Sequence, residues 1–181
     1  MLRLFKSPGP LGIFLLLAYT ALLRLYQFQP DAQWLVMPNK PAPLFELFVH
    51  GLKSAGIHHP LTYFVLSTLL VLGQAISLNG LIDRHKIFVR PYWLPAFSYV
   101  LLTSLFPEAS SFSPALLANS LLLLIFSRLF GTFRRDKCDR DLFDIGFFLR
   151  LTILVYPPAF IWVLFVVFSM LILRPFRIKE F

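Results

Sequence analysis

The stretch that decides the fold is residues 113–158, which read SPALLANSLLLLIFSRLFGTFRRDKCDRDLFDIGFFLRLTILVYPP. An apolar run fills residues 114–130, a charged run fills residues 134–141, and a second apolar run extends from Phe143 to Tyr156-Pro157-Pro158. Long apolar runs separated by a short charged run predict a membrane helix, a water-facing turn and a helix that returns. The rest of the chain repeats this pattern, so we expect an all-α, polytopic transmembrane bundle.

The composition favours a membrane protein over a soluble domain. Hydrophobic residues make up 57 % of the chain and charged residues 14 %, whereas soluble domains average about 45–50 % and about 25 %. The mean hydropathy is +0.72. The net charge of +8 does not indicate a nucleic-acid partner, because the basic residues form short clusters at the ends of apolar runs. We therefore expect membrane lipids and other integral membrane proteins as partners.

The apolar runs predict about six membrane helices in a single domain that covers residues 1–181. We expect these helices at 11–28, 60–82, 95–106, 114–130, 141–156 and 158–173. The run at 95–106 has 12 residues and extends only about 18 Å, too short to cross a hydrocarbon core of about 30 Å alone. Residues 44–57 form a shorter amphipathic segment, which predicts a helix that lies in the membrane interface.

The orientation follows from the distribution of Lys and Arg. With the N-terminus inside, 13 of the 17 basic residues fall on the cytoplasmic side, and only Lys40 and Lys53 fall in the outer segments. The other two, Arg24 and Arg150, lie within apolar runs. The positive-inside rule therefore predicts a multi-pass protein of the bacterial inner membrane with both ends of this chain in the cytoplasm.

A repeat connects the last two pairs of helices. Leu102-Thr103 with Pro107 matches Leu151-Thr152 with Pro157, and Pro114-Ala115 matches Pro158-Ala159. One explanation is a repeated helical hairpin in parallel orientation, which would make this chain the N-terminal part of a longer membrane protein. The other is that proline simply favours helix starts.

Arg150 is the most informative candidate residue. A charge near the middle of a membrane helix costs about 2.5–3.5 kcal/mol on insertion scales, so we expect it to face the bundle interior or a polar cavity. Asp144 lies on the same predicted helix but on a different face, so the partner of Arg150 would come from another helix or another chain. We expect an intramembrane ion pair or subunit contact that involves Arg150 and Asp144. The alternatives are snorkelling to the interface, which we expect for Arg24, and a substrate role.

A second candidate site lies on the predicted outer side, at Asp31, Glu46 and His50. An acidic residue after the first helix, followed by an interfacial helix, resembles the arrangement in C-type membrane glycosyltransferases, where an outward carboxylate acts on a lipid-linked sugar donor. The histidine spacing on this side does not predict a metal site. The chain has no glycine-rich phosphate loop and no Ser/His/Asp or Cys/His set, so we expect no cofactor and no catalytic residues.

Several apolar motifs spread over most of the chain carry a family resemblance. They are Met1-Leu2-Arg3-Leu4-Phe5-Lys6-Ser7, residues 94–107, Ser113-Pro114 with Leu117-Ala118-Asn119, Phe143-Asp144-Ile145-Gly146-Phe147, and Leu173-Arg174-Pro175-Phe176. Together they resemble an uncharacterised family of polytopic inner-membrane proteins from Bacteroidota. The resemblance implies a location and longer relatives, and it implies no activity. Our leading hypothesis is a non-enzymatic integral subunit of a multi-protein envelope assembly. The alternative is a C-type glycosyltransferase-like enzyme or carrier that acts on lipid-linked sugars.

Overall fold

The computed structural model describes residues 10–27, 35–37, 42–56, 59–88, 93–106, 111–132 and 139–173. This part of the chain is all-helical apart from one isolated bridge between Leu35 and Phe112, so the all-α prediction is confirmed. The helices are α1 (Pro10–Gln27), α2 (Pro43–Ser54), α3 (Pro60–Arg84), α4 (Leu94–Leu105), α6 (Pro114–Gly131), α7 (Asp139–Val155) and α8 (Ile161–Leu173), with the 3-10 turn η2 (Pro157–Phe160) before α8.

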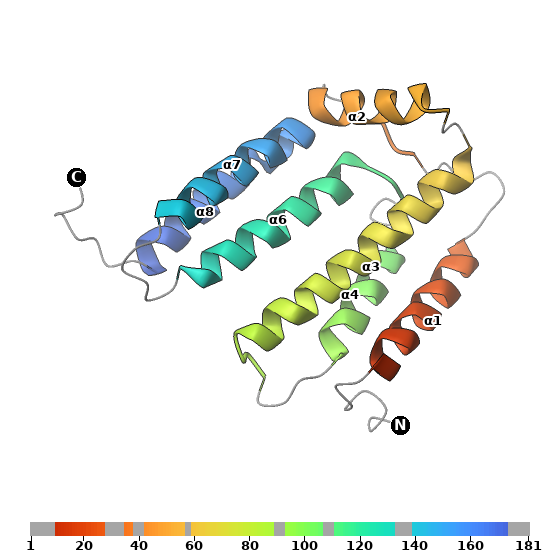
Figure 1. Cartoon of the computed structure of the whole chain (residues 1–181), viewed down its shortest axis with the longest axis horizontal. Helices are drawn as coiled ribbons and strands as arrows, with labels where there is room; N and C mark the ends of the chain where they lie inside the picture. Colours follow the sequence, from red (N-terminus) through yellow and green to blue (C-terminus); the bar gives the residue numbers. More distant parts are fainter. Residues whose placement is uncertain are drawn as a thin grey trace.

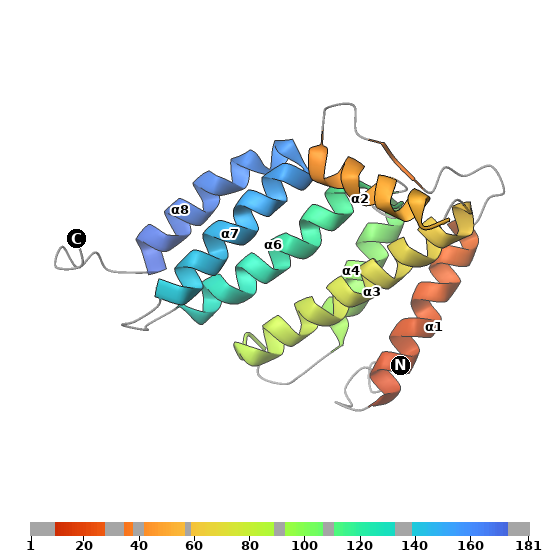
Figure 2. The ribbon, with the colours of Figure 1, turned by 45° about the horizontal axis from the view of Figure 1, so that its top comes forward.

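Six of the helices run side by side, and α2 lies across one end of them (Figure 1). The second view shows the same arrangement, with α2 passing over the ends of its neighbours (Figure 2). We call this end of the bundle the α2 end. The opposite end holds Arg84, Arg128, Asp141 and Asp144, and we call it the charged end.

The proline-led helix starts that the sequence predicts are present at Pro60 and Pro114. Proline lacks an N–H group, so the first turn of a helix loses nothing by containing it. The preceding residue caps each helix: His59 Nδ1 accepts a hydrogen bond from the Leu61 amide at 3.2 Å, and Ser113 Oγ accepts one from the Leu116 amide at 3.2 Å. These caps fix the beginnings of α3 and α6 at the α2 end.

The last predicted helix begins differently. The sequence predicts one helix over 158–173, whereas the structure has η2 at Pro157–Phe160 followed by α8. Two consecutive prolines supply no N–H groups, and the first available amide, that of Ala159, donates to the Tyr156 carbonyl at 2.9 Å. This short-range bond is characteristic of a 3-10 turn and explains the tighter start.

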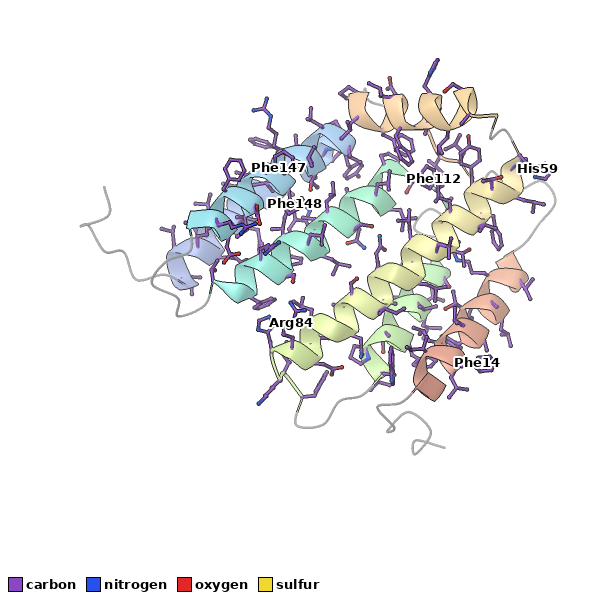
Figure 3. All side chains as sticks on the ribbon, viewed as in Figure 1. Phe14, His59, Arg84, Phe112, Phe147 and Phe148 are labelled. Carbon is purple, nitrogen blue, oxygen red and sulfur yellow. The ribbon has the colours of Figure 1, made fainter. Side chains whose placement is uncertain are left out.

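Three apolar clusters hold the bundle together, and α3 contributes to two of them. The first lies between α1, α3, α4 and α6 and contains Leu16, Val71 and Val100. The second lies beneath α2, where the ring of Phe112 is 5.7 Å from Phe45 and 5.9 Å from Tyr63 between ring centroids (Figure 3). The third joins α6, α7 and α8.

Two of the described helices, α3 and α6, are long and apolar enough to cross a membrane. The apolar part of α1, together with α4 and the segment Pro157–Ile172, falls below that length. The predicted shortness of the third apolar run agrees with α4, which has 12 residues. The count of six crossings stays a prediction.

A glycine sets the approach of α1 to α4. A Cβ atom added at Gly12 would lie 2.2 Å from Trp93 Nε1 and 2.4 Å from Trp93 Cδ1, whereas one added at Gly73 on α3 would meet no atom within 4 Å. We expect Gly12→Ala to lower the unfolding free energy by about 1–3 kcal/mol, because a packed interface is forced apart.

The measurement is thermal unfolding of the full chain in a mild detergent, with Gly73→Ala as the matched control. Gly73→Ala should keep or raise the midpoint, because alanine favours a helix more than glycine does. Equal midpoints for the two variants would show that Trp93 does not pack on Gly12.

Candidate functional site

The most connected polar group in the described structure is the side-chain amide of Gln74, which is buried on α3. Its Nε2 donates to the Leu116 carbonyl at 2.8 Å and to Ser120 Oγ at 2.7 Å, both on α6. Its Oε1 accepts a hydrogen bond from the hydroxyl of Tyr99 on α4. One side chain thus joins three helices, and both ends of the amide are satisfied away from water.

Asn119 on α6 extends this network. Its Nδ2 donates to the Tyr99 hydroxyl at 2.6 Å and lies 3.4 Å from Gln74 Oε1. The Tyr99 hydroxyl therefore acts as donor to Gln74 and as acceptor from Asn119, which uses both of its hydrogen-bonding roles. We call these four residues, Gln74, Tyr99, Asn119 and Ser120, the amide network.

A cavity of about 270 Å³ adjoins the amide network. Its lining includes Tyr99 and Thr103 of α4, Asn119 and Leu122 of α6, and Trp162 of α8. Within the described residues, the Oδ1 of Asn119 accepts no hydrogen bond. The cavity can hold a group that donates a hydrogen bond to this oxygen and is otherwise apolar, and its described lining contains no nucleophile paired with a base.

The amide network was not predicted from the sequence. Its signal was present, because Gln74 and Asn119 are amide side chains within long apolar runs, and polar residues in such runs usually face a helical partner. What the sequence lacks is the pairing, since Gln74 and Tyr99 are 25 residues apart and Gln74 and Ser120 are 46 apart.

We expect Gln74→Leu to lower the unfolding free energy of the chain by about 1–3 kcal/mol, because the Tyr99 hydroxyl loses its acceptor in a buried place. The measurement is thermal or chemical unfolding in detergent. Tyr99→Phe should cost less in the Gln74→Leu background than alone, because the two side chains share one bond. Ser77→Ala, at an exposed position on the same helix, is the control. Additive losses for Gln74 and Tyr99 would contradict the network.

Arg24 is the largest fully buried side chain, with 1 % of its surface exposed. Its Nη1 donates to Ser67 Oγ at 2.8 Å and to Thr68 Oγ1 at 3.2 Å on α3. The guanidinium carbon lies 5.9 Å from the centre of the Phe64 ring, within reach of a cation–π interaction. The Nε and Nη2 atoms are buried without a hydrogen-bond partner.

The burial of Arg24 corrects the expectation that this residue snorkels to the interface. The side chain extends sideways into α3 instead of along its own helix. Gly12, Leu16, Thr20 and Arg24 are all buried and are spaced four residues apart, which places them on one face of α1. Gly12, Thr20 and Arg24 at this spacing are the sequence feature that indicates which face of α1 is buried.

We expect Arg24→Met to keep or raise the unfolding midpoint. The hydroxyls of Ser67 and Thr68 already donate to the Phe64 carbonyl at 2.9 and 2.7 Å, so neither becomes unpaired when the arginine is removed. Replacing a buried charge by an apolar side chain of similar length is often neutral or stabilising by about 1–4 kcal/mol. The check is thermal unfolding of both proteins in detergent. A large fall for Arg24→Met would show that the guanidinium has a bound counter-ion.

Asp144 pairs with α6. Its Oδ2 lies 3.4 Å from Arg128 Nη2, and Asp141 Oδ1 lies 3.6 Å from Arg128 Nη1. One arginine thus joins two carboxylates one turn apart on α7, and ties α7 to α6 at the charged end. Asp144 therefore pairs with Arg128, whereas the sequence predicted an intramembrane ion pair or subunit contact that involves Arg150 and Asp144.

Arg150 is exposed on α7, which differs from the expectation that it faces the bundle interior. In the part of the chain that the structure describes, no ion pair involves it. Its helix face also carries Phe143, Phe147 and Leu154, which are 74 %, 52 % and 39 % exposed. The rings of Phe143 and Phe147 stack at 6.5 Å, and Figure 3 labels Phe147 beside the less exposed Phe148. We call Phe143, Phe147, Arg150 and Leu154 the α7 stripe.

The predicted outer-side site is only partly described. Asp31 lies outside the described residues. Glu46 and His50 are both exposed on α2, and a carboxylate oxygen of Glu46 accepts a hydrogen bond from the Ala42 amide at 3.3 Å. Glu46 therefore caps the start of its own helix. Neither residue lines the cavity beside the amide network.

Among the described residues, no three His, Cys, Asp or Glu side chains are grouped so that they could hold a metal ion. The polar features found in the described residues are the amide network, the buried Arg24, the ion pairs of Arg128, and the exposed Arg150 on an aromatic helix face. No protein-family model, curated protein or solved structure matches the chain.

Proposed function

We propose that this chain is a non-enzymatic, multi-pass subunit of a multi-protein assembly in a bacterial inner membrane, and that the α7 stripe is its contact with a neighbouring subunit. The observation that carries the proposal is Arg150, an exposed charge without an ion pair in the described chain, on an otherwise apolar and exposed helix face.

The outer surface of the described bundle supports a membrane setting. Large apolar side chains are exposed on every helix, among them Phe14, Leu69, Leu102, Phe143 and Ile172. Soluble monomers rarely expose contiguous apolar surface of this kind. Polar groups such as those of Arg24 and Gln74 are turned inward, the arrangement expected where lipid surrounds the helices.

The α7 stripe has the chemistry of a helix contact within a membrane. Positions 143, 147, 150 and 154 follow the alternating spacing of four and three residues that aligns side chains along one face of a helix. Stacked phenylalanine rings offer a rigid apolar surface, and one arginine among them favours a partner helix with an Asp or Glu at the same depth. This charge pair would select the partner and its register.

The competing hypothesis, action on lipid-linked sugars, depends on Asp31 with Glu46 and His50. Glu46 caps α2, and His50 faces outward, so neither described residue contributes to an enclosed site. The subunit proposal has the stronger support for this reason.

The test places a photo-crosslinking amino acid at Phe147 of the full chain in its native membrane, and repeats the experiment in the Arg150→Gln background. We expect a discrete protein adduct at Phe147 whose yield falls about tenfold or more with Arg150→Gln, because losing one partner of a buried charge pair costs about 2–5 kcal/mol. The control is the same probe at Phe168, which is 62 % exposed and belongs to a different helix, α8.

A charge exchange makes the test specific. Once the adduct has been mapped, Arg150→Glu should abolish it, and Arg150→Glu combined with an acid-to-Arg change in the partner should restore it. Lipid adducts alone at Phe147, or a protein adduct that is insensitive to Arg150, would overturn the proposal and favour snorkelling.

A further inference from the structure

A second cavity, of about 670 Å³, opens at the charged end between the last turns of α3 and α6 and the start of α7. Arg84 and His85 line it from the end of α3, Ser127, Arg128 and Phe130 line it from α6, and Asp141 lines it from α7. Figure 3 labels Arg84 at this end of α3. We call this cavity the basic cleft.

The two arginines that line the basic cleft differ in their ion pairs. The two terminal nitrogens of Arg128 face Asp141 at 3.6 Å and Asp144 at 3.4 Å, so the two carboxylates of α7 more than balance its charge. Within the described chain, Arg84 has no such ion pair, and it is exposed. Arg84 is therefore the arginine of the cleft lining that is not held in an ion pair within the described chain, and the Arg128 cluster lies on α6 and α7.

His85 adds a polar atom next to Arg84. Its ring packs on Phe130, with 5.3 Å between the ring centroids, and its Nε2 is buried without a hydrogen-bond partner. Buried polar atoms are nearly always satisfied in folded proteins, and each exception needs an explanation. Because His85 also lines the cleft, a small shift of its ring would bring this nitrogen to an oxygen atom of a ligand there.

These groups match the chemistry of a phosphate group. Phosphate has several acceptor oxygens, and a guanidinium, an imidazole N–H and a hydroxyl are the donors that bind them. The cleft volume lies within the range of about 300–1,000 Å³ that ligand sites occupy, so it admits a headgroup and not only a bare ion. Basic pockets between membrane helices on the cytoplasmic side are suited to anionic lipid headgroups.

We propose that the basic cleft binds a phosphate-bearing anion, with Arg84, His85 and Ser127 contacting its oxygens. The Arg128–Asp141–Asp144 cluster ties α7 to α6 at the same end. The apolar side chains of Leu124 and Phe130, which also line the cleft, suit the glycerol and upper acyl region of a phospholipid. The source of the phosphate is either an anionic phospholipid or a soluble phosphate compound. This proposal is independent of the α7 stripe.

The test measures binding to the purified full chain by native mass spectrometry and by thermal shift. The probes are phosphatidylglycerol, phosphatidylcholine with the same acyl chains, and inorganic pyrophosphate. We expect binding of phosphatidylglycerol or of pyrophosphate, and we expect Arg84→Gln to weaken it about tenfold, as loss of a hydrogen bond to a charged group does. Lys86→Gln is the matched control, because it removes the same charge from an exposed residue two positions away.

The outcomes are distinct. Binding of phosphatidylglycerol that depends on Arg84 identifies a lipid headgroup, and binding of pyrophosphate alone identifies a soluble ligand. Equal effects of Arg84→Gln and Lys86→Gln would show only general attraction to a positive surface and would overturn the proposal. So would the absence of binding to either phosphate probe.

A second variant guards against a loss of folding. His85→Phe keeps a ring against Phe130 and removes the ring nitrogens, so the unfolding midpoint without ligand should hold while phosphate binding falls. The proposal would also be overturned if His85→Phe and Arg84→Gln, each tested as a single variant, both left phosphate binding unchanged.

Discussion

The bundle depends on how α3 satisfies its polar side chains in an apolar surround. A buried amide without a partner costs about as much as a good packing contact gains, so Gln74 can be placed only where α4 and α6 supply matching groups. Tyr99 and Ser120 meet that demand. Seven residues earlier on the same helix, Ser67 does the same for Arg24 of α1. Positions 67 and 74 therefore determine which helices pack against α3 and at which point along its axis.

Much of the helical framework could be predicted from the sequence. The predicted starts at 60 and 114 coincide with the observed ones, because a proline and a capping residue encode them locally. The short length of α4 was also predictable, since prolines bound it. The limits of α1, α2 and α7 differ from the predictions by a few residues, which is usual where a helix end depends on neighbours and not on a strong local signal.

The candidate sites were predicted less well, for a physical reason. The position of a charge along a helix gives its depth, but its direction around the helix axis depends on tertiary packing. Arg24, expected to extend to the interface, is buried, and Arg150, expected to face inward, is exposed. The pairing of Asp144 with Arg128 likewise requires knowing that α6 and α7 pack as neighbours. The family resemblance and the membrane topology stay predictions.

The position of α2 has a consequence for biogenesis. Its buried residues Phe45 and Val49 pack on Phe112 and Tyr63, and Phe112 is made 58 residues after Ser54, the last residue of α2. Translation proceeds at about 5–20 residues per second, so α2 must wait for several seconds before its docking surface exists. In the membrane setting proposed above, the bilayer surface is where an amphipathic helix can bury its apolar face during that time. In that setting, the order of synthesis makes the bilayer a temporary partner for α2, which the later helices then replace.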